Sequence, residues 1–264
     1  MSDEEASKGV APICSAPINA DGTRLIAARG SVVDFTGGAI VNAANEGCLG
    51  GGGVDGAISR AGGNLLAEAR EALPVLDGRR VRCYTGHAKS TISGDLACEY
   101  VIHTVGPNYS YFDDYGEADV LLYMAYHSAV LEALALGVSD VAFCLVSAGI
   151  FRGRRSLRDV LALGVLAASA AVARCKSSAL KDIFIVAFTP AEVEALSGVV
   201  DALLVSADKQ DAVEELLQRV GPRVREIHAR AMGGASEPLQ PPIGYAMAQA
   251  AATTQYAMAC ETIL

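Results

Sequence analysis

The chain is poor in the features that mark nucleic-acid binders and disulfide-stapled proteins. It has no Trp, only 6% aromatic and 19% charged residues, and fewer Lys and Arg (21) than Asp and Glu (30), which gives a net charge of −9. General nucleic-acid binding draws its affinity from Lys and Arg on phosphates, so this balance argues against it. The seven cysteines are scattered, odd in number and without a CxxC pair. We therefore expect reduced thiols, with neither a bound metal nor a disulfide framework.

Long apolar runs and targeting signals are also missing. The longest apolar run, 161–173, is too short to span a membrane and contains Gly164. The first residues, MSDEEASKG, are acidic and polar and contain no apolar signal core. We expect an intracellular, cytoplasmic monomer that does not bind membranes.

Apolar strand patterns alternate with helical patterns along most of the chain. With 52% hydrophobic residues the chain is globular. Strands are predicted at 25–28, 39–42, 81–86, 100–105, 141–146 and 183–188, and helices at 55–61, 64–73, 117–136, 157–174 and 190–203. This alternation predicts an α/β fold whose sheet is covered by helices on both faces.

The two ends of the chain look different from this middle part. Residues 1–20 read as a loose N-terminal segment, and 206–264 as a helical C-terminal extension. Within the extension, the pattern over 205–232 predicts one amphipathic helix with a kink at Pro222. A linker at 233–242 and a final Ala- and Met-rich helix are expected to follow.

The segment 37–60, GGAIVNAANEGCLGGGGVDGAISR, carries the strongest functional signal. It combines a strand, two asparagines, four glycines and a helix start, an arrangement that favours binding of a diphosphate through backbone N–H groups. A P-loop would need a Lys after the glycines, and none is present. Gly51, Gly53 and Gly56 match GxGxxG, but Glu71 lies inside a helical pattern, which disfavours a dinucleotide fold. Asp55 beside phosphates suggests chemistry as well as binding.

Several motifs, in order, resemble those of the macrodomain family, and in particular its MacroD-type ADP-ribosyl-hydrolase branch. The motifs are VNAAN (41–45), LGGGGVDGAI (49–58), GHAKST (86–91), EYVIHTVGPNY (99–109) and SAGIF (147–151). The resemblance implies a three-layer α/β/α macrodomain sandwich over 21–205, with a central mixed sheet and ADP-ribose in a cleft at the strand ends.

The resemblance also implies a site. Asn45 and Asp55 match the family's catalytic residues: Asn45 holds the distal ribose and Asp55 positions the attacking water. Residues matched to ADP-ribose contacts are Ser31, Val32, Asn42, Ala43, Ala44, Asn45, Gly50, Gly51, Gly52, Gly53, Val54, Asp55, Ser147, Ala148, Gly149, Ile150, Phe151 and Phe188.

Simpler interpretations exist for some of these residues. Asn45 could merely close an Asx turn and Asp55 merely cap the helix. Ser147 with His103 as a nucleophilic pair has little support, because no GxSxG elbow is present. His103 itself lies in a strand pattern and is more typical of a core histidine.

The implied activity is removal of mono-ADP-ribose from Asp or Glu side chains of proteins, together with deacetylation of O-acetyl-ADP-ribose. The alternative is a reader module that binds ADP-ribose without turnover. The presence of both Asn45 and Asp55 favours the hydrolase, and the Gln-Glu-Glu triplet of a poly-ADP-ribose glycohydrolase is missing.

The chain departs from the family pattern at three places. Ser31 stands where the family has an Asp that reads adenine, and Ser59 where it often has His. The second loop continues into four arginines within 152–158. Such a run is usually solvated; we expect Arg152 to reach the diphosphate or an acidic substrate peptide.

Overall fold

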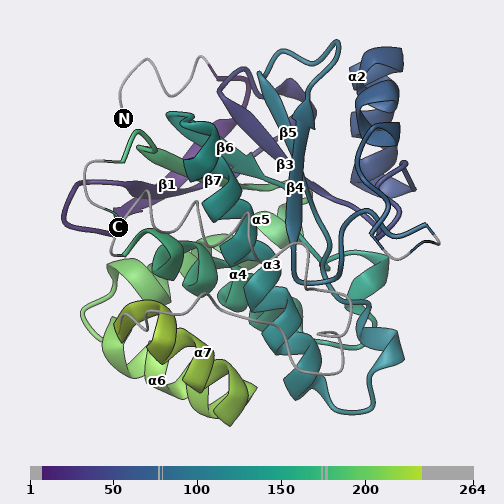
Figure 1. Cartoon of the computed structure of the whole chain (residues 1–264). Helices are drawn as coiled ribbons and strands as arrows, with labels where there is room; N and C mark the ends of the chain where they lie inside the picture. The colour runs from purple at the N-terminus through teal and green to yellow at the C-terminus, as the bar shows by residue number, and fades with distance from the viewer. Residues whose placement is uncertain (1–7, 77, 79, 174, 176–177, 234–264) are drawn as a thin grey trace.

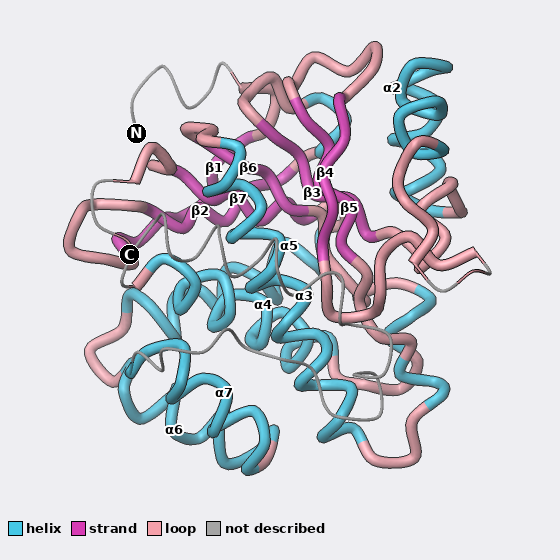
Figure 2. The backbone as a smooth tube through the Cα atoms, viewed as in Figure 1, coloured by secondary structure: helices cyan, strands magenta, loops and turns pink. Residues whose placement is uncertain are grey.

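The computed structural model describes residues 8–76, 78, 80–173, 175 and 178–233, and these fold around a mixed sheet (Figures 1 and 2). Five neighbouring strands run parallel, in the order β2-β7-β6-β3-β5, and antiparallel β1 and β4 form the two edges. The strands are β1 (Ala11–Pro17), β2 (Arg24–Arg29), β3 (Ala39–Ala43), β4 (Ala88–Ile92), β5 (Tyr100–Thr104), β6 (Asp140–Phe143) and β7 (Asp182–Ala187).

Helices cover both faces of the sheet, so the predicted three-layer architecture is confirmed. Helix α2 (Gly53–Glu71) and the short turn η1 (Val32–Asp34) lie on one face. Helices α3 (Tyr115–Leu136), α4 (Leu157–Val172) and α5 (Pro190–Val200) lie on the other. Helices α6 (Lys209–Val220) and α7 (Pro222–Gly233) pack outside α3 and α4 as the C-terminal extension (Figure 1).

Alternate residues of each central strand enter two different cores. Ile40 and Phe184 belong to the core under α2, whereas Val41 and Ile185 belong to the larger core under α3 to α5. This is the period-2 pattern of strands buried on both faces. Helix α3 is long and apolar enough to cross a membrane, but 67% of its apolar stretch is buried inside the protein, as in a core helix.

The N-terminal segment is more ordered than the sequence predicts. Strand β1 (Ala11–Pro17) occupies part of the expected loose lead-in and pairs antiparallel with β2. This strand was not predicted because it contains Pro12 and Pro17, and proline has no N–H to donate to the hydrogen bonds between strands. An edge strand tolerates it, and the register shifts between Pro12 and Cys14.

The predicted strand at 81–86 is wrong; the segment forms turns, and strand β4 begins later, at Ala88. The reason is a competing set of hydrogen bonds to Glu46. The backbone N–H groups of Arg82 and Cys83 donate to its carbonyl oxygen, and Thr85 donates to its carboxylate through both N–H and hydroxyl. Residues 82–85 are therefore fastened to the loop after β3.

The single helix predicted over 205–232 is two helices. Gly221 has φ 95° and ψ 174°, which ends α6, and Pro222 then begins α7. Proline is well suited to a first helical position because its N–H is not needed there. The expected linker and terminal helix fall on residues 234–264, outside the described residues, apart from Gly233.

Candidate active site

The predicted ligand residues lie together at the carboxyl ends of the parallel strands. Strand β3 leads into residues 44–53, here called the glycine loop, and β6 into residues 144–153, here called the second loop. Arg29 pairs with Ala187, so the segment 30–32 and Phe188 leave the sheet beside each other. Crevices at such strand ends are where ligands bind in open α/β folds.

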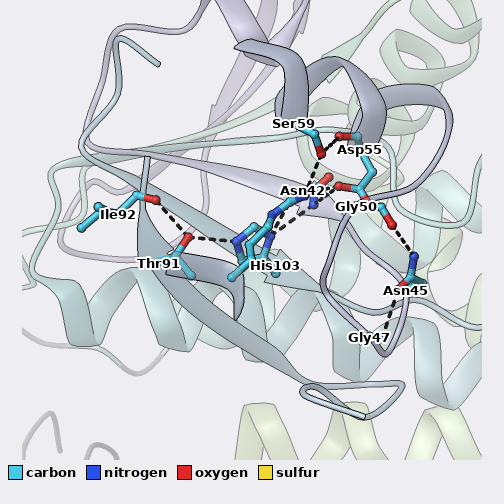
Figure 3. A network of polar contacts seen from close by, with 10 residues as sticks. Asn42, Asn45, Gly47, Gly50, Asp55, Ser59, Thr91, Ile92 and His103 are labelled. Carbon is cyan, nitrogen blue, oxygen red and sulfur yellow. Dashed lines mark hydrogen bonds and ion pairs between the residues drawn. The ribbon is translucent and has the colours of Figure 1, made fainter. Parts of the chain in front are cut away.

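Asn45 closes the glycine loop on itself. Its Nδ2 donates to the carbonyl oxygen of Gly50 at 2.9 Å, and its Oδ1 accepts from the N–H of Gly47 at 3.0 Å (Figure 3). The Asx-turn interpretation is therefore correct for Asn45. Gly50 and Gly53 have φ of 106° and 59°, which favours glycine at both positions. The loop then delivers exposed Gly51–Gly53 to the start of α2, where backbone N–H groups lack helical partners.

Asp55 is the third residue of α2 and is only 3% exposed. The N-cap is Gly52, without a side-chain cap, so the interpretation of Asp55 as the capping residue is wrong. Its Oδ1 accepts from Asn42 Nδ2 at 2.9 Å and from Arg70 Nη2 at 2.7 Å. The other oxygen, Oδ2, faces Gly51: a Cβ added to that glycine would lie 3.1 Å from it. One carboxylate oxygen is thus held by the protein, and the other borders the glycine loop.

Asn42 supports Asp55 and is fully buried. Its Nδ2 also approaches His103 Nδ1 at 3.2 Å, as Figure 3 shows. Ala44, another predicted ligand contact, is 3% exposed. Both residues therefore lie behind the surface of the site, and the ligand contacts predicted for them stay predictions.

Arg70 is the member of the site that sequence reasoning missed. It is 2% exposed, and its guanidinium donates to Asp55 and, through Nη1, to Ser59 Oγ at 2.7 Å. Ser59 in turn donates to the backbone carbonyl of Asp55 at 2.8 Å. The signal was present in the helical period: Arg70 follows buried Leu66 by four residues and so shares its buried face.

His103 completes the buried network and has a defined tautomer. Two donors, on Asn42 and Arg70, face its Nδ1, so this nitrogen accepts and Nε2 carries the proton. Nε2 then donates to Thr91 Oγ1 at 2.9 Å, and that hydroxyl donates to the carbonyl of Ile92. Burial, and secondarily the charge of Arg70, hold the pKa of His103 well below its usual range, so the ring is neutral.

The second loop is held by Ser147, which has φ 54° and is 4% exposed. Its hydroxyl donates to the carbonyl of Pro107 at 2.8 Å, so Ser147 anchors the loop and is not paired with His103. Beyond it, Gly149 is exposed, Ile150 is 90% exposed and Phe151 is half-buried. The tip of the second loop is therefore open to solvent at the same edge as the glycine loop.

The arginine run has a structural role that the sequence did not predict. Nε and Nη1 of Arg152 donate to the carbonyls of Ala148 and Arg155, so these groups brace the second loop from within. Arg155 forms ion pairs with Asp119 and Asp159, both at 2.8 Å. These acids compensate the cation beside the start of α4. The two hydrogen bonds of Arg152 use only Nε and Nη1, so its predicted contact with the diphosphate or an acidic substrate peptide stays a prediction.

The remaining predicted contacts lie at the ends of β2 and β7. Ser31 caps η1: its Oγ accepts from the N–H of Val33 at 3.3 Å. Val32 is 3% exposed, whereas Phe188 is 76% exposed. Of this group, Phe188 presents a large apolar surface to solvent.

Comparison with known proteins agrees with this geometry. Residues 41–157 match the model of the Macro domain. The chain is 41% identical over 139 residues to "O-acetyl-ADP-ribose deacetylase 1" of Pantoea vagans, covering 52% of this chain and 78% of that protein. It is 41% identical over 129 residues to the "O-acetyl-ADP-ribose deacetylase" of Escherichia fergusonii, covering 49% of this chain and 70% of that protein.

Solved structures give the same result. A mutant of the Oceanobacillus iheyensis macrodomain with ADPR superposes with a TM-score of 0.64 at 25% identity, over 72% of this chain and 97% of that one. The Trypanosoma brucei macrodomain in complex with ADP-ribose gives 0.56 at 30% identity, over 75% and 83% of the two chains. The chain belongs to the macro domain family.

Proposed function

We propose that the protein is a hydrolase of ADP-ribose esters that deacetylates O-acetyl-ADP-ribose and releases mono-ADP-ribose from Asp and Glu side chains of proteins. The observation that carries the proposal is the state of Asp55, a buried carboxylate with Oδ1 held by Asn42 and Arg70 and Oδ2 turned to the glycine loop. A reader module would need the loops but not this carboxylate. The relatives named as deacetylases support the same class of reaction.

The two loops supply affinity and position. Exposed backbone at Gly51–Gly53, at the start of α2, suits the diphosphate, because free N–H groups and the helix dipole both favour an anion. The second loop, with exposed Gly149 and Ile150, closes the other side of the ligand. Phe188 supports the adenine end.

The chemistry follows from Asp55. Its Oδ2 accepts a hydrogen bond from a water molecule and takes up the proton as the water attacks the ester. Attack on the acetyl carbonyl breaks its bond to the ribose oxygen. That oxygen leaves as part of ADP-ribose and takes the proton back from Asp55, which yields acetate and ADP-ribose. Asn45 lies beside the same point, since a Cβ on Gly51 would be 3.4 Å from Asn45 Nδ2.

Asp55→Asn tests this function. The substitution keeps the size of the side chain and its acceptor oxygen but removes the charge, so we expect acetate release to fall by about 10²- to 10⁴-fold. ADP-ribose affinity should stay the same or rise, because a negative charge leaves the cleft. Acetate and ADP-ribose are measured by mass spectrometry, with an Asp- or Glu-linked ADP-ribosyl peptide in parallel, and ADP-ribose binding by calorimetry.

Asp140→Asn is the matched control. Asp140 is also a buried, ion-paired carboxylate, bound to Lys8 at 2.7 Å, but it begins β6 and so lies at the amino ends of the parallel strands, away from the site. It should lose stability and keep turnover per folded molecule. Full activity in Asp55→Asn would refute the mechanism, and ADP-ribose binding without release by the natural chain would make the protein a reader.

A further inference from the structure

We propose that Arg70 is the positioning residue of the active site: it fixes the Asp55 carboxylate through Oδ1 so that Oδ2 stays directed at the attacking water. This inference rests on the proposed hydrolase function. Arg70 itself lies behind Asp55 and is 2% exposed, so it acts on the reaction through that carboxylate.

The form of the ion pair supports a positioning role. Arginine commonly binds a carboxylate with two parallel N–H groups, which would occupy both oxygens. Here Arg70 donates to Asp55 through Nη2 and to Ser59 through Nη1, and both partners lie in the first turns of α2. The result is a carboxylate held at one oxygen, with the other oxygen facing Gly51.

The helix is shaped to make this contact. Asp55 and Arg70 are separated by 15 positions along α2, which in a straight helix would place them about 22 Å apart along its axis. In the structure Arg70 Nη2 lies 2.7 Å from Asp55 Oδ1. The reversal occurs at Gly63, whose φ of 62° and ψ of −158° break the helix. The break therefore returns Arg70 to the beginning of the helix.

The side chains next to the Asp55–Arg70 ion pair also affect its electrostatics. His103 is neutral and accepts at Nδ1, so it adds no second positive charge beside the Asp55–Arg70 ion pair. The charge of Asp55 also makes a smaller contribution to the pKa of the Cys48 and Cys144 thiols. Burial raises the pKa of Cys144 to about 12, while a hydrogen bond with Cys83 lowers that of Cys48.

Two buried polar atoms of this cluster have no partner among the described residues, Asn42 Oδ1 and Arg70 Nε. Buried polar groups in proteins are normally satisfied, so leaving two unmatched in one cluster opposes stability. Such exceptions in a native structure call for an explanation, and a functional role of the cluster supplies one.

The test compares Arg70→Met and Arg70→Lys with the natural chain, using O-acetyl-ADP-ribose at pH 5 to 9. In Arg70→Met we expect kcat to fall about 100-fold, as for a misplaced catalytic group, with KM and ADP-ribose affinity within about threefold. The acid limb of the pH–rate profile should move to higher pH, because a buried carboxylate without its cation binds a proton more readily. Arg70→Lys should restore the position of this limb but only part of kcat. Arg24→Met breaks an ion pair with Asp182 at the amino ends of the parallel strands, away from the site, and should leave kcat unchanged.

If Arg70→Met does not fold, Ser59→Ala replaces it. This change removes one anchor of the guanidinium and should lower kcat about 3- to 10-fold at unchanged KM, the net effect typical of losing one intramolecular hydrogen bond. Unchanged kcat and pH profile in the folded variants would overturn the positioning role alone, as would equal losses of kcat and ADP-ribose affinity. No acetate release by the natural chain would overturn the proposed function and this inference together.

Discussion

At the scale of single residues, exposure divides the site into two groups. Asn42, Asp55 and Arg70 are buried, and Asn42 and Arg70 each donate a hydrogen bond to Asp55, so a change in any of them alters both stability and activity. Ile150 and Phe188 are 90% and 76% exposed. Substitution of such exposed side chains usually changes the free energy of unfolding little, so an effect on ligand binding can be measured separately.

Phe188 gives a prediction of this second kind. Phe188→Ala should weaken ADP-ribose binding by about 5- to 150-fold, the range expected from loss of one base-stacking contact worth roughly 1–3 kcal/mol. The midpoint of thermal unfolding should change by no more than a degree or two. Val205→Ala, at an exposed apolar residue of the turn after α5, is the control for both measurements. An unchanged dissociation constant in calorimetry would remove Phe188 from the ligand site.

At the scale of elements, the break in α2 is the feature on which the site depends. Gly63 lies in the left-handed region, where any residue with a Cβ is strained, and a Cβ there would also displace the carboxylate of Asp95. The backbone conformation therefore strongly favours glycine at this position. The geometry of the second half of α2, and with it the place of Arg70, is therefore set by a single glycine.

Gly63→Ala tests this dependence. We expect a loss of about 1–3 kcal/mol in the free energy of unfolding from backbone strain, and a fall in kcat per folded molecule because Arg70 is displaced. Gly198→Ala is the control: this glycine lies in α5, with nothing within 4 Å of an added Cβ, and alanine there should be stabilising by about 0.5–1 kcal/mol. Denaturant unfolding and steady-state kinetics measure the two effects. Unchanged stability and kcat in Gly63→Ala would show that the helix does not need the break.

Local sequence predicts well those elements whose secondary structure is determined by their own residues. Strand β3 and the halves of α2 on either side of Gly63 were predicted because apolar periods and glycines mark them. Strand β1 was missed because its prolines are acceptable only at a sheet edge, which the chain does not reveal locally. The contact of Arg70 with Asp55 was missed for a similar reason, since it exists only after the helix folds back. The candidate catalytic residues came from motifs, but their partners came from tertiary structure.

At the scale of the whole molecule, all four histidines have lowered pKa values. Burial lowers the pKa of His87 and of His127 to about 4, and that of His228 and His103 below its usual range; nearby cations add to the effect at His87 and His103. Each native histidine therefore stays neutral at a pH where the same residue in the unfolded chain, with a pKa near 6.5, binds a proton.

Acidification should therefore destabilise the protein well above the range in which carboxylates titrate. Below pH 6.5 the unfolded chain holds more protons, so the free energy of unfolding falls as pH falls, by up to about 1.4 kcal/mol per pH unit for each histidine. For His87 and His127 this continues to about pH 4, where their native forms also protonate. Urea unfolding at pH 7 and pH 5 measures the difference in the free energy of unfolding. His127→Gln should make this difference smaller by the contribution of one histidine. Equal stability at the two pH values would contradict the prediction.

The strand order has a consequence for synthesis on the ribosome. Strand β2 pairs only with β1 and β7 within the described sheet, and β7 is the last strand to be translated. The first hairpin must therefore wait for roughly 150 residues of further chain, which at about 5–20 residues per second is on the order of 10–30 s. During that delay the apolar strand β2 has no partner on its inner side. Nascent chains shorter than about 190 residues are thus the species of this protein that we expect to need a chaperone most.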